Sequence, residues 1–168
     1  FNGELFRRET FEEITMSLRI PPKKSGSAAN NVTFGVQVSS GSSKNIKAKT
    51  PGMGLFYDKG WIAYRTGGGQ EKAFQDGDLH REGGDVVKRE WPTDEWIQIR
   101  IVRLDADKGE MAIYLTTEAD GEVELFRDFV SGFKSSRGKA SLVLMGWSND
   151  REEFDCTVKD IVVVRRTR

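Results

Sequence analysis

Apolar and polar residues alternate with a period of two along most of this chain. In EEITMSLRI, residues 12–20, the apolar side chains of Ile14, Met16, Leu18 and Ile20 fall on one side. NVTFGVQVS, residues 31–39, places Val32, Phe34, Val36 and Val38 in the same way. Strict alternation is typical of a β-strand with one buried face. We therefore predict a strand in each segment, separated by a loop.

The second half of the chain repeats this pattern. In DEWIQIRIVRL, residues 94–104, three isoleucines at 97, 99 and 101 share one face, opposite Trp96, Gln98, Arg100 and Val102. Four further alternating segments cover 110–117, 122–129, 139–148 and 153–164. Residues 52–69 indicate a hairpin turning at Asp58-Lys59-Gly60, because glycine readily takes the positive φ of a tight turn.

These segments predict a single all-β domain over residues 1–168, an antiparallel sandwich of two sheets, with a barrel as the alternative. Residues 67–90 are glycine-rich and charged with weak periodicity, which indicates a long irregular loop. The best helical candidate is short and lies between Asp128 and Ser135. We expect Asp160 to mark a bulge or turn that resets the register before Ile161 and Val163.

Composition narrows the classes of function. The 168 residues contain 26 basic and 26 acidic side chains, so no net field steers the protein toward nucleic acid. Basic residues gather only in early loops and at Arg165, Arg166 and Arg168, which leaves polyanion binding as a minor hypothesis. No apolar run reaches the length of a membrane span. The lone Cys156 is compatible with a reducing compartment or an exported bacterial protein, and Asn31 begins a glycosylation sequon.

Three stretches resemble the concanavalin A-like lectin and glucanase superfamily. WPTDEWIQIRIVRLDADKGEMAIYL, residues 91–115, is similar to its strand-turn-strand unit, and residues 140–164 are similar to its closing strand pair. The opening, residues 5–38, is similar to the first strands of the laminin-G-like and 3-keto-disaccharide hydrolase-like branches. The resemblance implies a jelly roll of two curved sheets that binds ligands on one sheet or at a rim of loops.

Acidic residues near the C-terminus raise the possibility of an enzyme. The glucanases of this superfamily carry E-x-D-x-E or E-x-D-x-x-E on one strand, and Glu153 and Asp155 supply the first two acids. Thr157 and Val158 occupy the positions of the third acid. The alternative is that Phe154, Cys156 and Val158 face inward, which leaves Glu153, Asp155 and Thr157 as a solvated polar face.

Metal and nucleophile chemistry has few candidates. His80 and Cys156 are the only residues of their types, too few for an ordinary His/Cys zinc site. A dyad of these two is conceivable, but an inward Cys156 behaves as a small core residue. Oxygen ligands at residues 105–110 and 148–153 are candidates for binding calcium, and turn chemistry explains their Asp, Asn and Gly residues equally well. We expect no cofactor.

Aromatic residues supply the better binding candidates. Sugar rings pack on flat aromatic surfaces while amide and charged groups fix their hydroxyls. The candidate ligand-binding residues are Trp61, Tyr64, Arg65, Trp91, Trp147 and Asn149. Each aromatic among them has the alternative of a core or sheet-edge position, and Trp96 is expected to be structural.

The leading hypothesis is a non-catalytic recognition domain that binds a glycan or a protein segment and belongs to a larger protein or assembly. One alternative is a carbohydrate-active hydrolase with an acidic cleft at Glu153 and Asp155. Another is a structural module that docks subunits or binds a polyanion. A recognition domain for glycans would bind sugar without cleaving it. A hydrolase would lose its activity when Glu153 and Asp155 are substituted, and a structural or polyanion-binding module would bind no sugar.

Overall fold

The computed structural model describes residues 2–8, 10–20, 32–41, 52–58, 61–66, 91–134, 138–148 and 155–166. Nearly all of them lie in strands, namely β1 (Asn2–Arg7), β2 (Phe11–Arg19), β3 (Val32–Ser40), β4 (Gly52–Asp58), β5 (Trp61–Thr66), β6 (Ile97–Asp105), β7 (Glu110–Thr117), β8 (Gly121–Phe129), β9 (Lys139–Ser148) and β10 (Thr157–Arg165). The predicted loop at 67–90 lies outside the described residues.

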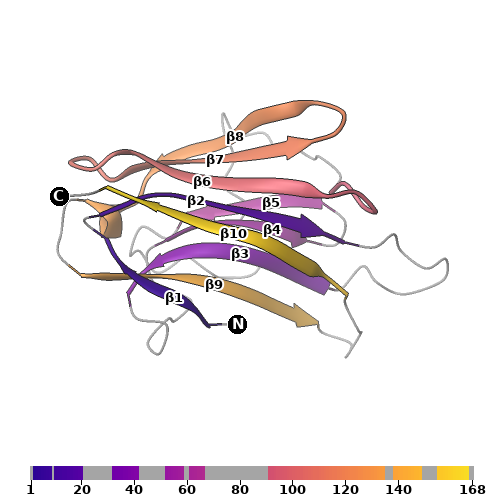
Figure 1. The fold of residues 1–168 in the computed structure, drawn as a ribbon, viewed down its shortest axis with the longest axis horizontal. Helices are drawn as coiled ribbons and strands as arrows, with labels where there is room; N and C mark the ends of the chain where they lie inside the picture. Colours follow the sequence, from indigo (N-terminus) through magenta and orange to yellow (C-terminus); the bar gives the residue numbers. More distant parts are fainter. Residues whose placement is uncertain are drawn as a thin grey trace.

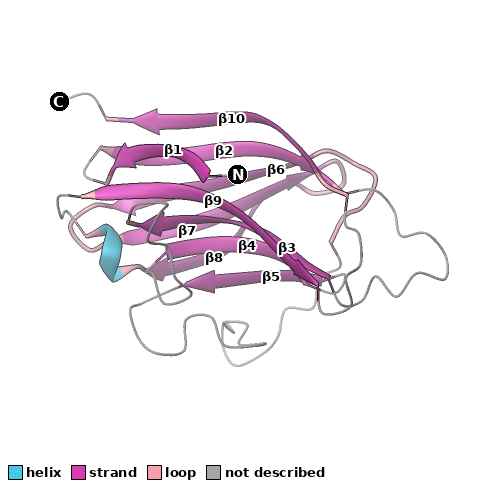
Figure 2. Ribbon diagram, turned by 90° about the horizontal axis from the view of Figure 1, so that it is seen from below, coloured by secondary structure: helices cyan, strands magenta, loops and turns pink. Residues whose placement is uncertain are grey.

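The strands form two stacked antiparallel sheets whose strands run along the long axis of the molecule (Figures 1 and 2). Within the described residues, sheet A has the order β1-β9-β3-β4-β5 and sheet B the order β10-β2-β6-β7-β8. Sequence neighbours such as β1 and β2 belong to different sheets, so the chain repeatedly crosses from one layer to the other. The architecture is the predicted two-sheet jelly roll and not the alternative barrel.

The hydrophobic core fills the space between the sheets, and the alternation identifies its side chains correctly. The inward residues of β2 and β6 are almost fully buried, and so are Val36 and Val38 of β3. Leu55 and Met53 of β4 meet Val36 and Val38 in register on the same face. Each fully buried aliphatic side chain stabilises the fold by roughly 1.5–3 kcal/mol, so this double layer of side chains holds the sheets together.

β10 confirms the expected register change. Its pairing with β2 shifts between Lys159 and Val162, and Asp160 adopts a left-handed φ of 53° at the break. Before the break, Cys156 and Val158 pack against the core while Asp155 and Thr157 are exposed, as the alternating interpretation predicts. Phe154 and Glu153 lie outside the described residues.

One end of the sandwich is closed by a single turn of 3-10 helix, η3 (Ser131–Phe133) (Figure 2). It is shorter than the helix expected between Asp128 and Ser135. Phe133 is buried and meets the Phe11 ring edge-on at 6.0 Å between centroids. No helix found in the described ranges is long and apolar enough to cross a membrane.

Candidate functional site

Two of the predicted tryptophans occupy one row of sheet A. Trp61 on β5 pairs with Asp58 on β4, Asp58 pairs with Thr33 on β3, and Thr33 pairs with Trp147 on β9. Residues directly opposite one another in a sheet share a face. The neighbouring row contains Phe34, which packs on the core, so the tryptophan row belongs to the opposite side. We call this side, directed away from sheet B, the glycine-rich face.

Arg65 belongs to the same face as the tryptophans. Its row runs from Arg65 through Gly54 and Gln37 to Val143. Tyr64 instead pairs with Leu55, a core residue, so its position belongs to the inward set. The strands β3, β4, β5 and β9 therefore bring three of the predicted binding residues, Trp61, Arg65 and Trp147, to one side of one sheet.

Gln37 lies in the middle strand of the glycine-rich face. Its side chain is 1% exposed, and its Nε2 donates a hydrogen bond of 2.8 Å to Ser39 Oγ on the same strand. Its Oε1 is buried and has no hydrogen-bond partner. If the amide is turned by 180°, the nitrogen loses its partner instead, so one end of the group is unpaired in either orientation. A buried amide in this state is costly, because it has given up water without a replacement.

Glycines make room for the two large side chains of this face. A Cβ on Gly35 would lie 2.0 Å from Phe56 Cδ1, and one on Gly54 would lie 2.9 Å from Phe56 Cε2. The Phe56 ring thus occupies the space above two strands. Gly52 plays the same part for Gln37, since its Cβ would lie 2.7 Å from the amide Nε2. The Phe56 ring and the Gln37 amide therefore lie close over these glycines, and both are buried.

Two serines also lie on the glycine-rich face, near Gln37. Ser39 and Ser141 pair with each other across β3 and β9, and both are fully buried. Ser141 Oγ donates a 2.8 Å hydrogen bond to the Gly41 carbonyl, so its hydroxyl is satisfied within the chain. Gln37 differs from Ser141 in this respect, because the Oε1 of its amide has no hydrogen-bond partner.

The remaining predicted residues lie elsewhere. Trp91 is 4% exposed and belongs to the core, where it meets the Tyr57 ring edge-on at 6.0 Å. This is the core alternative that its sequence position left open, and it takes Trp91 away from the surface. Asn149, Glu153 and His80 lie outside the described residues, whereas Asp155 is exposed two residues before β10.

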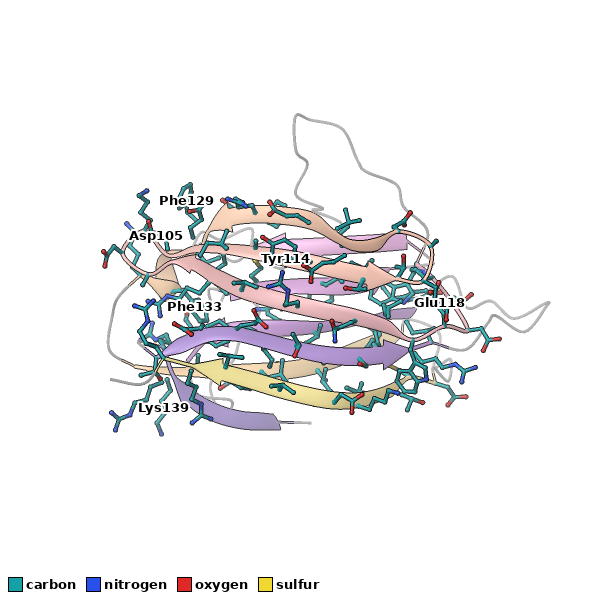
Figure 3. All side chains as sticks on the ribbon, turned by 45° about the horizontal axis from the view of Figure 1, so that its top comes forward. Asp105, Tyr114, Glu118, Phe129, Phe133 and Lys139 are labelled. Atoms are coloured by element: carbon teal, nitrogen blue, oxygen red, sulfur yellow. The ribbon has the colours of Figure 1, made fainter. Side chains whose placement is uncertain are left out.

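The outer side of sheet B, which we call the charged face, is built differently (Figure 3). Tyr114 lies near its middle, with Asp105 and Phe129 at one end and Glu118 at the other. The Arg100 guanidinium stacks 4.3 Å from the centroid of the Tyr114 ring. It also binds Glu13 at 3.1 Å and Glu122 at 2.7 Å. These contacts link the side chains of β2, β6, β7 and β8 across the sheet.

A second group on the charged face neutralises Glu124. Arg127 Nη2 lies 2.8 Å from Glu124 Oε2, and its Nε donates to the other carboxylate oxygen at 2.9 Å. Hydrogen bonds from Arg127, and then from Tyr114, hold the pKa of Glu124 below its usual value. A general acid for glycoside cleavage needs a raised pKa. Glu124 is therefore unsuited to that role.

The other chemical candidates are accounted for by local structure. Asp105 Oδ1 accepts hydrogen bonds from the backbone N–H groups of Asp107 and Lys108 at 2.9 and 3.0 Å, so it caps its own turn. Burial raises the pKa of the Cys156 thiol to about 12, which disfavours the reactive thiolate. The described ranges contain no group of three or more His, Cys, Asp or Glu residues placed to hold a metal.

Sequence reasoning missed Gln37 and Phe56, although a signal was present. Between the core residues of β4, the alternate positions are Gly52, Gly54 and Phe56. The corresponding positions of β3 are Gly35, Gln37 and Ser39. Outward positions normally carry charged side chains. An outward face made of glycine, amide, hydroxyl and ring is the pattern that distinguishes these two strands.

Comparisons with known proteins bear on the fold. No protein-family model and no curated protein matches the chain. Among solved structures, the lectin UEA-II complexed with galactose superimposes with a TM-score of 0.55 at 12% identity, over 92% of this chain and 72% of the lectin. Lectin II from Ulex europaeus gives 0.53 at 12% identity, with the same shares of 92% and 72%.

The chain has a lectin-like jelly-roll fold. An alginate lyase from Pseudomonas aeruginosa shares it, with a TM-score of 0.50 at 13% identity over 99% of this chain and 68% of the lyase. The expected concanavalin A-like architecture is thereby confirmed. Identities this low show the fold alone, so the laminin-G-like or 3-keto-disaccharide hydrolase-like branch stays a prediction.

Proposed function

We propose that this domain binds a glycan chain, without cleaving it, on the glycine-rich face of sheet A. The observation that carries the proposal is the register that places the positions of Trp61, Arg65 and Trp147 on one face of sheet A. Tryptophan offers a flat apolar surface for the C–H groups of a sugar ring, and arginine and amide groups hydrogen-bond its hydroxyls. The lectin-like fold supports this function by analogy only.

The spacing of the tryptophans favours a chain over a single sugar. Trp61 and Trp147 stand at the two ends of a row that crosses β5, β4, β3 and β9. Three spacings between neighbouring strands amount to about 14 Å. A pyranose ring is only about as wide as one such spacing. An oligosaccharide laid across the strands would meet both tryptophans, whereas a monosaccharide would meet one.

A glycan array followed by calorimetric titration tests the proposal. We expect the protein to bind oligosaccharides of several units more tightly than the corresponding monosaccharide. Trp61→Ala and Trp147→Ala should each weaken the binding about tenfold, since each removes an aromatic platform.

Trp96→Ala is the matched control. Trp96 is 37% exposed, but it lies beside sheet B, where the Lys159 ammonium sits 3.9 Å from the centroid of its ring. Its loss should leave glycan binding unchanged. Absence of sugar binding by the wild-type protein would overturn the proposal and favour recognition of a protein segment by the same face.

A further inference from the structure

We propose that Arg7 and Lys139, two cations opposite each other at one end of sheet A, bind the sulfate or carboxylate groups of an acidic glycan. They lie at the end of the sandwich that η3 closes, where Figure 3 labels Lys139 and Phe133. Along β9, Lys139 is eight positions from Trp147, which corresponds to about 27 Å. The inference goes beyond the proposed function, because it concerns a second surface and a different ligand chemistry.

The two cations are direct cross-strand partners. Arg7 on β1 pairs with Lys139 on β9, and next to them the Arg8 N–H donates a 3.0 Å hydrogen bond to the Gly138 carbonyl. Residues directly opposite each other in antiparallel strands have Cβ atoms about 5 Å apart, and like charges in such a pair destabilise the sheet. The register therefore holds two positive charges together at the expense of the free protein's stability.

Both side chains are open to solvent. Arg7 and Lys139 are exposed, whereas the neighbouring Ala140 is buried in the core. Within the ranges that the structure describes, neither the Arg7 guanidinium nor the Lys139 ammonium forms an ion pair or a hydrogen bond. Glu12, an acidic residue at the same end, is bound by Arg166 at 2.9 Å. A ligand in solution can therefore reach both cations.

A third cation is fixed beside the pair. Arg8 Nη1 donates a 2.7 Å hydrogen bond to the Gly132 carbonyl of η3. Gly138 makes room for the rest of the guanidinium, since a Cβ there would lie 2.0 Å from Arg8 Nη2. Because Gly138 directly precedes Lys139, this arrangement brings a third positive charge next to the pair. The Arg8 side chain is partly buried, so salt screens its charge less than it screens an exposed one.

The exposure of the site determines the kind of ligand. A single exposed ion pair is weak and is screened by salt. Useful affinity therefore requires a ligand with several anionic groups, so that neighbouring cations can bind at the same time. A guanidinium binds two oxygens of one sulfate or carboxylate in parallel, and an ammonium adds a compact point charge. A polysaccharide with an anionic group on successive units offers this combination.

Nucleic acid is the other common polyanion, and this end of the sandwich suits it less well. Binding to a duplex spreads over many phosphates, whereas three cations at one corner cover only a few. Single strands are bound largely by stacking of their bases on exposed aromatic rings. Phe11 and Phe133, which lie at this end, are buried. An acidic glycan needs no such stacking, so it is the ligand that the site favours.

Calorimetric titration of a double variant, Arg7→Gln with Lys139→Gln, tests the proposal. The titrants are a sulfated oligosaccharide from heparin, a carboxylated one from polygalacturonate and a neutral one from dextran. We expect the wild-type protein to bind at least one acidic oligosaccharide, with an affinity that falls about tenfold between roughly 50 and 200 mM salt. The double variant should bind it about tenfold more weakly or worse, and the tighter acidic titrant identifies the anionic group.

The matched control removes the same charge from the opposite end of the molecule. In Arg19→Gln with Lys159→Gln, the lost cations are one that pairs with Asp94 and one that lies on the Trp96 ring. This variant should keep its affinity for the acidic oligosaccharide. The melting temperature of the unliganded Arg7→Gln, Lys139→Gln protein should not fall below that of the wild type, since a like-charged pair is removed.

Several results would overturn the site. Equal weakening in the two double variants would show a response to total charge alone, and a lower melting temperature in Arg7→Gln, Lys139→Gln would show that these cations stabilise the free fold. The site would also be wrong if the wild type bound neither acidic oligosaccharide, or bound a single-stranded DNA of equal charge more tightly through the same residues. Trp61→Ala should leave acidic binding unchanged, so failure of the tryptophan row and failure of this site are distinguishable.

Discussion

Polar side chains are paired differently on the two outer faces of this sandwich. On the charged face, Arg100 is shared by Glu13, Glu122 and the Tyr114 ring, and Arg127 saturates Glu124. At the centre of the glycine-rich face, Gln37, Ser39, Ser141 and Phe56 are buried, and one end of the Gln37 amide has no hydrogen-bond partner. A surface whose groups bind one another has little left for a ligand. The centre of the glycine-rich face holds its amide and hydroxyl groups by local hydrogen bonds, and the positions of Trp61 and Trp147 form a row at one end of it.

Filling the space above Gly35 should have the largest effect. Gly35→Ala would place a Cβ 2.0 Å from the Phe56 ring and force that ring to move. We expect a loss near the upper end of the roughly 1–3 kcal/mol that overpacking costs, measured by urea unfolding, together with weaker glycan binding.

Gly121→Ala provides the control for Gly35→Ala. Gly121 has a φ of +67° but open space around it, so only backbone strain is added. That strain costs about 1 kcal/mol, and glycan binding should not change. An unaltered unfolding midpoint in Gly35→Ala would mean that the Phe56 ring does not depend on the glycine.

Breaking the charged face should cost less and should spare binding. Arg100→Leu removes the partner of two carboxylates and the cation over Tyr114, while most of the Arg100 side chain is buried. We expect a loss of about 1–2 kcal/mol in the free energy of unfolding, with unchanged affinity for the oligosaccharide.

Arg19→Leu is the comparison for Arg100→Leu. Arg19 makes a single, well-exposed ion pair with Asp94, and its loss should cost less than about 0.5 kcal/mol. If Arg100→Leu abolished sugar binding while the protein remained folded, the functional surface would have been assigned to the wrong sheet.

Acid should act on the charged face through Glu124. Because the pKa of Glu124 is lowered in the folded state, the stability it contributes is present above its unfolded pKa and is lost as pH falls through the depressed folded value. Urea midpoints measured from neutral pH into this acidic range should fall less steeply for Glu124→Gln than for the wild type. Parallel pH profiles would show that the Arg127 pair does not stabilise the fold.

The smallest effect is expected at Asp155. The residue is exposed two residues before β10, and surface substitutions away from special contacts change stability by less than about 0.5 kcal/mol. Asp155→Asn should therefore match the wild type in urea unfolding and in glycan titration. A glycosidase activity that disappears in this variant would support the acidic-cleft alternative instead.

The strands could be predicted from the sequence because the alternation of apolar and polar residues within each segment indicates a strand and its buried side. Alternation identified the buried side of β2, β3, β6 and β7, and Asp160 marked the break in β10. The face that carries the candidate site needed pairing across distant strands. Trp61 and Trp147 are 86 residues apart, and only the register of β5, β4, β3 and β9 puts them in one row.

Residue type alone does not distinguish a binding tryptophan from a core tryptophan at Trp91. Trp91 precedes β6 outside any alternating segment, so periodicity could not show that its ring enters the core beside Tyr57. Gln37 was missed for the opposite reason. Gln37 occupies one of the polar positions in the alternating pattern of β3. Only the hydrogen bonds in the structure show that one end of its amide is unpaired.

The break in β10 has a consequence for behaviour at high concentration. The strand lies at the edge of sheet B and carries exposed Ile161, Val162 and Val164, a composition prone to intermolecular β-pairing. Asp160 bends this strand with a left-handed residue, and Lys159 and Arg165 place charges around the apolar run. Bulges and flanking charges hinder the addition of another chain to an open edge. The register break at Asp160 thus also disfavours pairing of the β10 edge with a second chain, which reduces the tendency to aggregate.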